Sequence, residues 1–177
     1  MSLLKTIQRR SIAAALLVLC LSACGGSGSK TAQQAAPLDS CALLTRADAE
    51  ALLGGPVAEP DRDQVDSHDP SDPTAVSQCH YHTTGEDYRH VGILARRARS
   101  ASEALQGFES TRDSDVDTTP AQPVSGVGEQ AFWRASNGGQ LTTLKGSVML
   151  IVSADAGSAD KLTTTRTAAN DALARLQ

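Results

Sequence analysis

The sequence has 177 residues, and its 16 basic and 20 acidic residues give a net charge of −4 at neutral pH. An acidic chain repels nucleic acid, and two tyrosines, two phenylalanines and one tryptophan are few for a base-stacking platform, so we expect no nucleic-acid partner. The length suits one globular domain preceded by a leader.

The first 23 residues have the pattern of a bacterial export signal. Lys5, Arg9 and Arg10 form a positive start, and residues 11–23 follow as an uncharged run of small and apolar residues. A helix that crosses a bilayer needs about 20 apolar residues, so this run fits the shorter apolar part of a cleaved signal peptide. The run ends in a tetrapeptide that closely resembles the lipobox of bacterial lipoproteins, Leu21-Ser22-Ala23-Cys24.

The lipobox resemblance implies that Cys24 carries lipid. In that family the cysteine thiol is acylated and the chain is cut just before it, which predicts a signal peptide at residues 1–23. Several acyl chains, such as palmitate, hold a protein on a membrane without a spanning helix. An ordinary signal peptide and an uncleaved short anchor are the alternatives. By resemblance to sorting in two-membrane bacteria, Gly25 permits transfer to the outer membrane; in a single-membrane host the protein would lie on the outer face of the plasma membrane.

Residues 24–38 form the predicted tether. They are rich in glycine, serine, alanine and glutamine and show no periodicity, which is typical of a flexible linker. The folded domain is therefore expected at residues 39–177. Removal of the leader takes away three basic residues and leaves 13 against 20 acidic ones, a mature net charge of −7. Such a charge also argues against peripheral binding to anionic lipid, so we expect the acyl chains alone to bind the membrane.

Two cysteines remain once Cys20 leaves with the leader and Cys24 is acylated. In an exported protein the pair Cys41 and Cys79 is expected to form a disulfide. The closed loop would be nearly forty residues long. A reactive dithiol or a metal-binding pair is the alternative, although the wide spacing does not match a Cys-x-x-Cys motif.

The first half of the domain predicts two helices and a hairpin. Thr45 and Asp48 form an approximate capping box for a helix that ends at Gly54-Gly55-Pro56. Residues 59–77 are polar and predict a surface loop, whereas residues 79–83 and 88–96 predict two strands with a turn between them. Ser100 and Glu103 cap a helix whose apolar face consists of Ala101, Ala104, Leu105 and Phe108.

The second half predicts three strands and a helix. The strands are residues 131–136, 140–145 and 148–154, and Gly146-Ser147 supplies a two-residue hairpin turn. A final helix is capped by Ser158 and has an apolar stripe of Leu162, Ala169, Ala172, Leu173 and Leu176. The order α-ββ-α-βββ-α predicts a single α+β domain, with an antiparallel sheet of about five strands and helices packed on it.

Three short motifs carry a family resemblance that spans most of the folded domain. They are Asp39-Ser40-Cys41 before the first helix, Cys79-His80-Tyr81 in mid-chain and Gly126-Val127-Gly128-Glu129 before the last strands. Together they resemble the uncharacterised bacterial lipoproteins with Asp-Pro-Cys and Gly-Val-Gly-Asp motifs, best known from actinobacteria. The chain departs from that pattern at Ser40 and Glu129. The resemblance implies an exported lipoprotein domain, with a sheet-and-helix fold similar to PsbP-like lipoproteins, and brings no activity with it.

The histidines are the candidate metal ligands. His80 and His82 flank Tyr81, so strand alternation places both imidazoles on one face and Cys79 with Tyr81 on the other. Two histidines at this spacing could share a metal ion with His90 or His68 as a third ligand. The alternative is a set of solvated histidines on an exposed strand face.

Trp133 is the candidate interaction residue. It follows Phe132 on a predicted strand, so the two rings point to opposite faces and one of them is expected to lie exposed. The sequence contains no recognisable catalytic constellation or cofactor motif, so we expect no enzyme and no cofactor.

These patterns support three functional hypotheses. The first is a membrane-anchored envelope lipoprotein with a non-enzymatic domain that binds a partner protein or small ligand, one version being an immunity-type inhibitor of an imported toxin. The second is an extracytoplasmic metal-binding protein or enzyme that uses His80 and His82. The third is a structural component of the envelope.

Overall fold

The computed structural model describes residues 36, 38–66, 75–114, 119–157 and 160–176. Its helices are α1 (Ser40–Leu43), α2 (Arg46–Leu53), α3 (Ala101–Arg112) and α4 (Lys161–Arg175), with a 3-10 turn η1 (Ser136–Gly138). Its strands are β1 (Asp61–Asp66), β2 (Ala75–His82), β3 (His90–Arg97), β4 (Gln122–Pro123), β5 (Gln130–Arg134), β6 (Gln140–Lys145) and β7 (Val148–Asp155).

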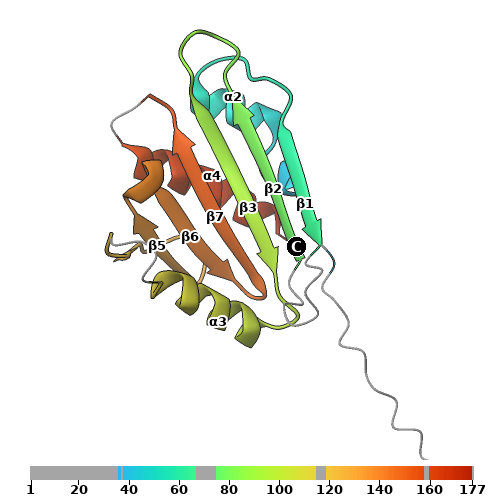
Figure 1. Cartoon of the computed structure of the whole chain (residues 1–177), viewed down its shortest axis with the longest axis vertical. Helices are drawn as coiled ribbons and strands as arrows, with labels where there is room; N and C mark the ends of the chain where they lie inside the picture. The colour runs from blue at the N-terminus through green and yellow to red at the C-terminus, as the bar shows by residue number, and fades with distance from the viewer. Residues whose placement is uncertain (1–35, 37, 67–74, 115–118, 158–159, 177) are drawn as a thin grey trace, which may run out of the picture. The chain divides into compact units, whose positions relative to one another are not determined.

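The strands form one antiparallel sheet in the order β1-β2-β3-β7-β6-β5-β4 (Figure 1). The hairpins β2–β3 and β6–β7 meet at the centre, where β3 pairs with β7 along its full length. This pairing places the final apolar strand in the middle of the sheet, as its uninterrupted run of apolar residues predicts. The α+β class with an antiparallel sheet is therefore correct.

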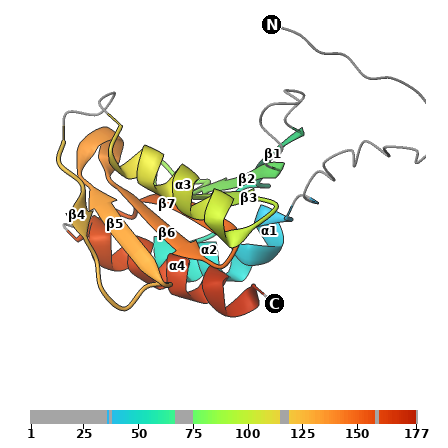
Figure 2. The ribbon, with the colours of Figure 1, turned by 90° about the horizontal axis from the view of Figure 1, so that it is seen from below.

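The helices lie on opposite faces of the sheet (Figure 2). One face is covered by α1, α2 and α4, and it holds the larger apolar core, which includes Leu53, Leu150 and Ala169. The other face carries α3, whose Phe108 packs with Phe132 and Met149 over β5, β6 and β7. Because α3 covers only the β5–β6–β7 half of this face, no helix in the described part of the chain lies over β1, β2 and β3 there.

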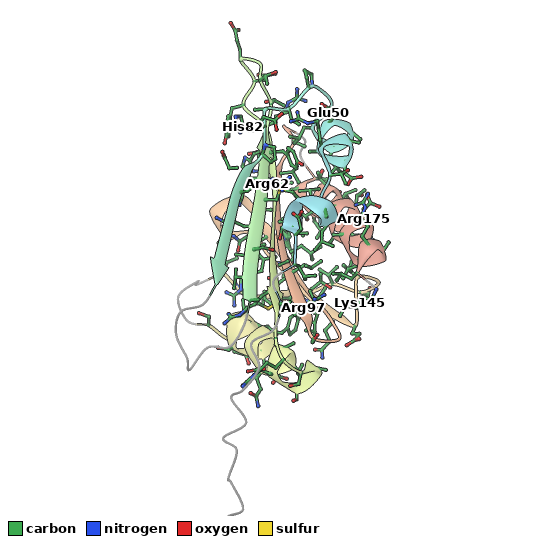
Figure 3. All side chains as sticks on the ribbon, turned by 90° about the vertical axis from the view of Figure 1, so that its right-hand side faces the viewer. Glu50, Arg62, His82, Arg97, Lys145 and Arg175 are labelled. Atoms are coloured by element: carbon green, nitrogen blue, oxygen red, sulfur yellow. A yellow bond between two sulfur atoms is a disulfide. The ribbon has the colours of Figure 1, made fainter. Side chains whose placement is uncertain are left out.

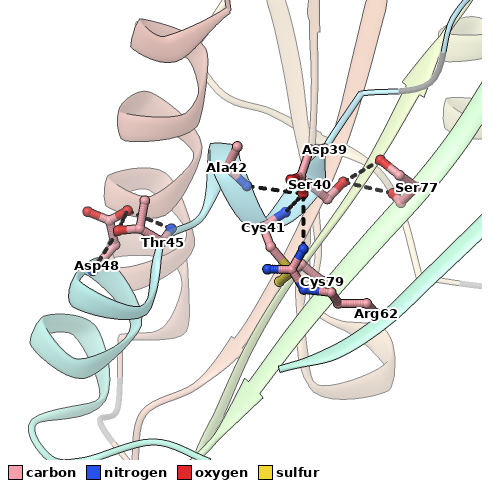
Figure 4. Close-up of a disulfide and its surroundings, with 9 residues drawn as sticks. All are labelled: Asp39, Ser40, Cys41, Ala42, Thr45, Asp48, Arg62, Ser77 and Cys79. Carbon is pink, nitrogen blue, oxygen red and sulfur yellow. Dashed lines mark hydrogen bonds and ion pairs between the residues drawn. A yellow bond between two sulfur atoms is a disulfide. The ribbon is translucent and has the colours of Figure 1, made fainter. Parts of the chain in front are cut away.

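The structure contains the expected disulfide between Cys41 and Cys79, with the two Cα atoms 5.2 Å apart (Figure 4). It fixes α1 against β2, where the Ser40 hydroxyl also donates a hydrogen bond to the Ser77 carbonyl oxygen over 2.9 Å. The Asp39 carboxylate accepts from the Cys41 amide at 2.9 Å and so caps α1. Both cysteines are buried, so the link ties the start of the domain to its core.

The helix boundaries follow the capping signals. Thr45 and Asp48 form a reciprocal capping box at the start of α2, and Gly54 ends it with a left-handed φ of 69°. Ser100 caps α3 by accepting from the Glu103 amide. Asp160, two residues after the expected Ser158, caps α4 through the Thr163 amide, while Ser158 itself lies outside the described residues.

The predicted number and order of strands are wrong. The described residues form seven strands rather than five, and two short helices, α1 and α2, precede the sheet rather than one. β1 lies within the stretch predicted as a polar loop, and β4 adds a two-residue edge strand at the opposite side. Edge strands tolerate polar and charged residues, because their outer edge faces solvent, so β1 with three aspartates lacks the alternation that marks a half-buried strand.

Several predictions concern residues outside the described part of the chain. They include the lipobox, the lipidated Cys24, most of the tether and His68. Among the residues that the structure describes, no helix is long and apolar enough to cross a membrane.

Candidate functional site

The three candidate histidines share the sheet face that α3 leaves uncovered. Buried and half-buried residues alternate along β2, so His80 and His82 lie on one face and Cys79 and Tyr81 on the other, as the sequence predicts. His90 is the direct cross-strand partner of His82. Figure 3 shows His82 at the end of β2 next to the β2–β3 loop, far from Arg97 at the other end of the sheet.

Tyr88 completes a ring cluster with two of these histidines. Its ring centroid lies 5.9 Å from that of His82, with the planes 22° apart, and 5.9 Å from that of His90. Tyr88 is 70% exposed, and it is the one large hydrophobic side chain among the described residues that is exposed. We call His82, Tyr88 and His90 the His–Tyr cluster. The two imidazoles flank the tyrosine ring, which is itself largely exposed to solvent.

His90 is half-buried at the start of β3. Its Nδ1 atom is buried and has no hydrogen-bond partner among the described residues. Burial lowers the pKa of His90 from its ordinary value of 6.5; the Asp155 carboxylate opposes that shift, and His80 and Lys161 add to it. Asp155 faces His90 across the strand pair, and it accepts a hydrogen bond from Lys161 Nζ over 2.9 Å, which lowers the pKa of Asp155.

The lowered pKa of His90 predicts a loss of stability on acidification. The unfolded chain binds this proton more readily than the folded domain does. The contribution of His90 to the free energy of unfolding is therefore present above about pH 6.5, and it declines as the pH falls through the lower pKa of the folded state. In an NMR titration the His90 ring proton should report a pKa below 6.5. His90→Gln should flatten the fall in unfolding free energy between about pH 7 and pH 5. Titration of His90 at or above its ordinary pKa would contradict the predicted burial effect.

His80 lies flat over the neighbouring strand. Its cross-strand partner is Gly92, and a Cβ atom at that position would stand 2.4 Å from His80 Nδ1 and 2.5 Å from its Cε1. The absence of a side chain at Gly92 therefore gives the imidazole its place on the sheet.

Gly92→Ala should displace the His80 ring and cost about 1–3 kcal/mol of unfolding free energy, because the added methyl group overlaps the ring. Denaturant unfolding measures the loss, and the His80 ring shifts in NMR spectra report the displacement. The double variant Gly92→Ala/His80→Ala should recover most of the stability, since the methyl group then has room. A double variant no more stable than Gly92→Ala would show that the strain lies elsewhere.

The metal hypothesis stays a prediction. The three histidines share one face, yet no group of three or more histidine, cysteine, aspartate or glutamate side chains among the described residues is arranged to hold a metal ion. The imidazoles of His82 and His90 instead pack beside Tyr88, and that of His80 lies over Gly92.

The expectation that one of the two rings, Phe132 or Trp133, lies exposed is wrong. Trp133 is only 9% exposed, and Phe132 on the opposite face is 2% exposed, because helices cover both faces of the sheet at β5. The indole lies across Gly139, where a Cβ atom would stand 2.3 Å from its Cη2 atom. The exposed aromatic residue is Tyr88 instead. The sequence contained a signal for it, since Tyr88 and His90 are two residues apart in the predicted strand and so share a face.

Comparisons with known proteins give little further guidance. No protein-family model and no curated protein matches the chain. Among solved structures, the extracellular domain of PknH from Mycobacterium tuberculosis aligns with a TM-score of 0.48 and 11% identity, over 79% of this chain and 98% of that chain. A likeness at this level assigns no function to the chain.

Proposed function

We propose that the mature protein is a lipid-anchored envelope lipoprotein whose non-enzymatic domain binds a partner protein through the His–Tyr cluster. The exposure of Tyr88 carries this proposal. In an immunity-type version, the partner would be an imported toxin.

Two features support an extracytoplasmic location. The leader ends in Leu21-Ser22-Ala23-Cys24, which predicts acylation of Cys24 after export. The folded domain holds a disulfide between Cys41 and Cys79, and such links form and persist in oxidising compartments outside the cytoplasm. The resemblance to lipoproteins with Asp-Pro-Cys and Gly-Val-Gly-Asp motifs agrees with this location.

The surface around Tyr88 suits protein recognition. Tyrosine is enriched at binding hot spots, because its ring offers a large rigid contact area and its hydroxyl can hydrogen-bond at the rim. The rings of His82 and His90 flank Tyr88 and add further contact area beside it. The neighbouring sheet face over β1, β2 and β3 carries no helix of the described chain, so a partner can approach from that side.

Site-specific photo-crosslinking tests the proposal. A photoreactive phenylalanine analogue replaces Tyr88 in the full-length lipoprotein in host cells, and mass spectrometry identifies any adduct after irradiation. We expect one dominant protein adduct from position 88. The control position is Ala101, which is exposed at the start of α3. Identical adducts from both positions, or none from position 88, would contradict the proposed surface.

Metal binding is a second candidate function, favoured by the placement of His80, His82 and His90 on one sheet face. Calorimetric titration of the metal-free protein with zinc or copper tests it. Tight binding that His82→Ala abolishes would support a metal-carrier role, and the absence of tight binding would remove it.

A further inference from the structure

A pocket separate from the His–Tyr cluster opens behind the β2–β3 loop. Its volume is about 540 Å³, and it is lined by residues 54–56 at the end of α2, by residues 83–87 of the loop and by Arg89. Small-ligand sites commonly occupy about 300–1,000 Å³, so the pocket is large enough for a small molecule.

Hydrogen bonds of the backbone and of the Thr83 hydroxyl hold the residues around the pocket in place. The Thr83 amide donates to the Arg89 carbonyl oxygen at 3.0 Å, and the Arg89 amide donates to the Thr83 hydroxyl at 3.0 Å. The same hydroxyl donates to the Asp87 carbonyl oxygen at 2.6 Å, which closes the loop. The Ala58 amide donates to the His82 carbonyl oxygen at 2.9 Å, so the segment after α2 is fixed to the end of β2. Because these hydrogen bonds lie within the domain itself, the pocket is pre-formed.

Arg89 lines the pocket and lies close to three glycines. A Cβ atom at Gly157 would stand 3.4 Å from Arg89 Cδ, and Cβ atoms at Gly54 and Gly55 would stand 3.4 and 3.8 Å from its two terminal nitrogens. These are ordinary van der Waals separations, so Arg89 packs along the three glycines, and its guanidinium group reaches the end of α2 that lines the pocket.

One nitrogen of the Arg89 guanidinium group is buried without a partner among the residues that the structure describes. Arg89 Nε is buried without a hydrogen-bond partner, and no carboxylate in the described segments of the chain forms an ion pair with Arg89. An unpaired buried donor on a charged group costs free energy, whereas a carboxylate against the guanidinium group gains charge-assisted hydrogen bonds. A ligand carboxylate would supply the missing partner.

The rest of the pocket favours positive charge. Glu86 and Asp87 both line it and are exposed, and the C-terminal end of α2 adds the negative end of a helix dipole. A simple anion would meet Arg89 but be repelled by these groups, whereas a simple cation would be repelled by Arg89. A molecule with both charges matches the whole pocket.

We infer that the Arg89 pocket binds a small zwitterion, such as an amino acid or short peptide, with its carboxylate on the Arg89 guanidinium group and its ammonium group beside Glu86 and Asp87. This site is independent of partner binding at the His–Tyr cluster, and either can fail without the other.

NMR titration of the 15N-labelled mature protein tests the inference with four probes: glycylglycine, acetate, ethylammonium and inorganic phosphate. We expect glycylglycine to give saturable shifts at Gly54, Gly55 and Gly85, with a Kd at least about tenfold below those of acetate and ethylammonium. Arg89→Gln should weaken glycylglycine binding by about tenfold or more, because the carboxylate loses its ionic partner.

Two further variants separate binding from folding. Arg99→Gln makes the same charge change at an arginine that pairs with Glu103 on α3, and it should leave glycylglycine binding unchanged. Glu86→Gln/Asp87→Asn alters exposed side chains, and it should weaken glycylglycine binding while leaving acetate binding equal or stronger. The inference is overturned if glycylglycine fails to saturate the pocket, if phosphate binds more tightly than glycylglycine, or if Arg99→Gln causes the same loss as Arg89→Gln.

Discussion

Removal of the Cys41–Cys79 disulfide is expected to lower the unfolding free energy of the domain by about 3–4 kcal/mol. The link closes a loop with a sequence separation of 38, and its loss frees the unfolded chain to adopt many more conformations. For a domain of this size the melting temperature should fall by roughly 10–20 °C. Thermal and denaturant unfolding of Cys41→Ala/Cys79→Ala in detergent micelles measures both quantities. Alanine is chosen because Cys79 is fully buried, and a serine hydroxyl there would need a partner.

The single variants provide the control for this prediction. Either Cys41→Ala or Cys79→Ala breaks the same covalent link, so each should destabilise the domain nearly as much as the double variant. Treatment of the native protein with a strong reductant should reproduce the effect. A loss below about 1 kcal/mol in all of these measurements would mean that the disulfide contributes little beyond the contacts around α1.

Phe108→Ala is expected to destabilise the domain by about 3–5 kcal/mol. Phe108 is 2% exposed and is the main apolar side chain that α3 contributes to the sheet. Its ring packs edge-on against Phe132 with centroids 5.2 Å apart, beside Leu144 and Met149. Truncation leaves a cavity between α3 and the sheet, so hydrogen exchange in α3 should accelerate more than in α4, which lies on the opposite face.

Phe108→Leu is the matched control for the cavity. Leucine keeps most of the apolar contact and loses the aromatic pairing with Phe132, so its cost should be well below that of alanine. If both variants cost less than about 1 kcal/mol, the second core would not hold α3 as the structure indicates.

Local signals predicted much of the fold. Capping residues located α2 and α3 closely, and the alternation along residues 79–83 placed His80 and His82 on the face opposite Cys79. The cysteine count predicted the disulfide, because only Cys41 and Cys79 remain once the predicted signal peptide and lipidation site are set aside. The helix caps and the strand alternation depend on side chains close in the sequence. The disulfide depends on a pairing for which only one partner is left.

Features that depend on tertiary context were not predictable. The polar residues of β1 form a strand because β2 offers them hydrogen-bond partners, although their pattern resembles that of a loop. The burial of Trp133 depends on α4 and the turn at Gly139, and the position of α3 decides which half of the other face stays open.

The Arg89 pocket illustrates the same limit. Its lining comes from two segments that lie far apart in the sequence, residues 54–56 and residues 83–89. Arg89 follows turn residues and precedes a strand, so the local sequence does not distinguish it from an ordinary solvent-exposed arginine. Only the fold shows that its guanidinium group is partly buried without a partner among the described residues.

Mass spectrometry of the mature N-terminus tests the central claim of a lipid-anchored lipoprotein most directly. We expect an N-terminal peptide that begins at Cys24 and carries acyl chains on that residue, and we expect Cys24→Ala to release the folded domain from the membrane fraction. A mature chain that begins at any other residue, or a Cys24 with a free thiol, would contradict the account.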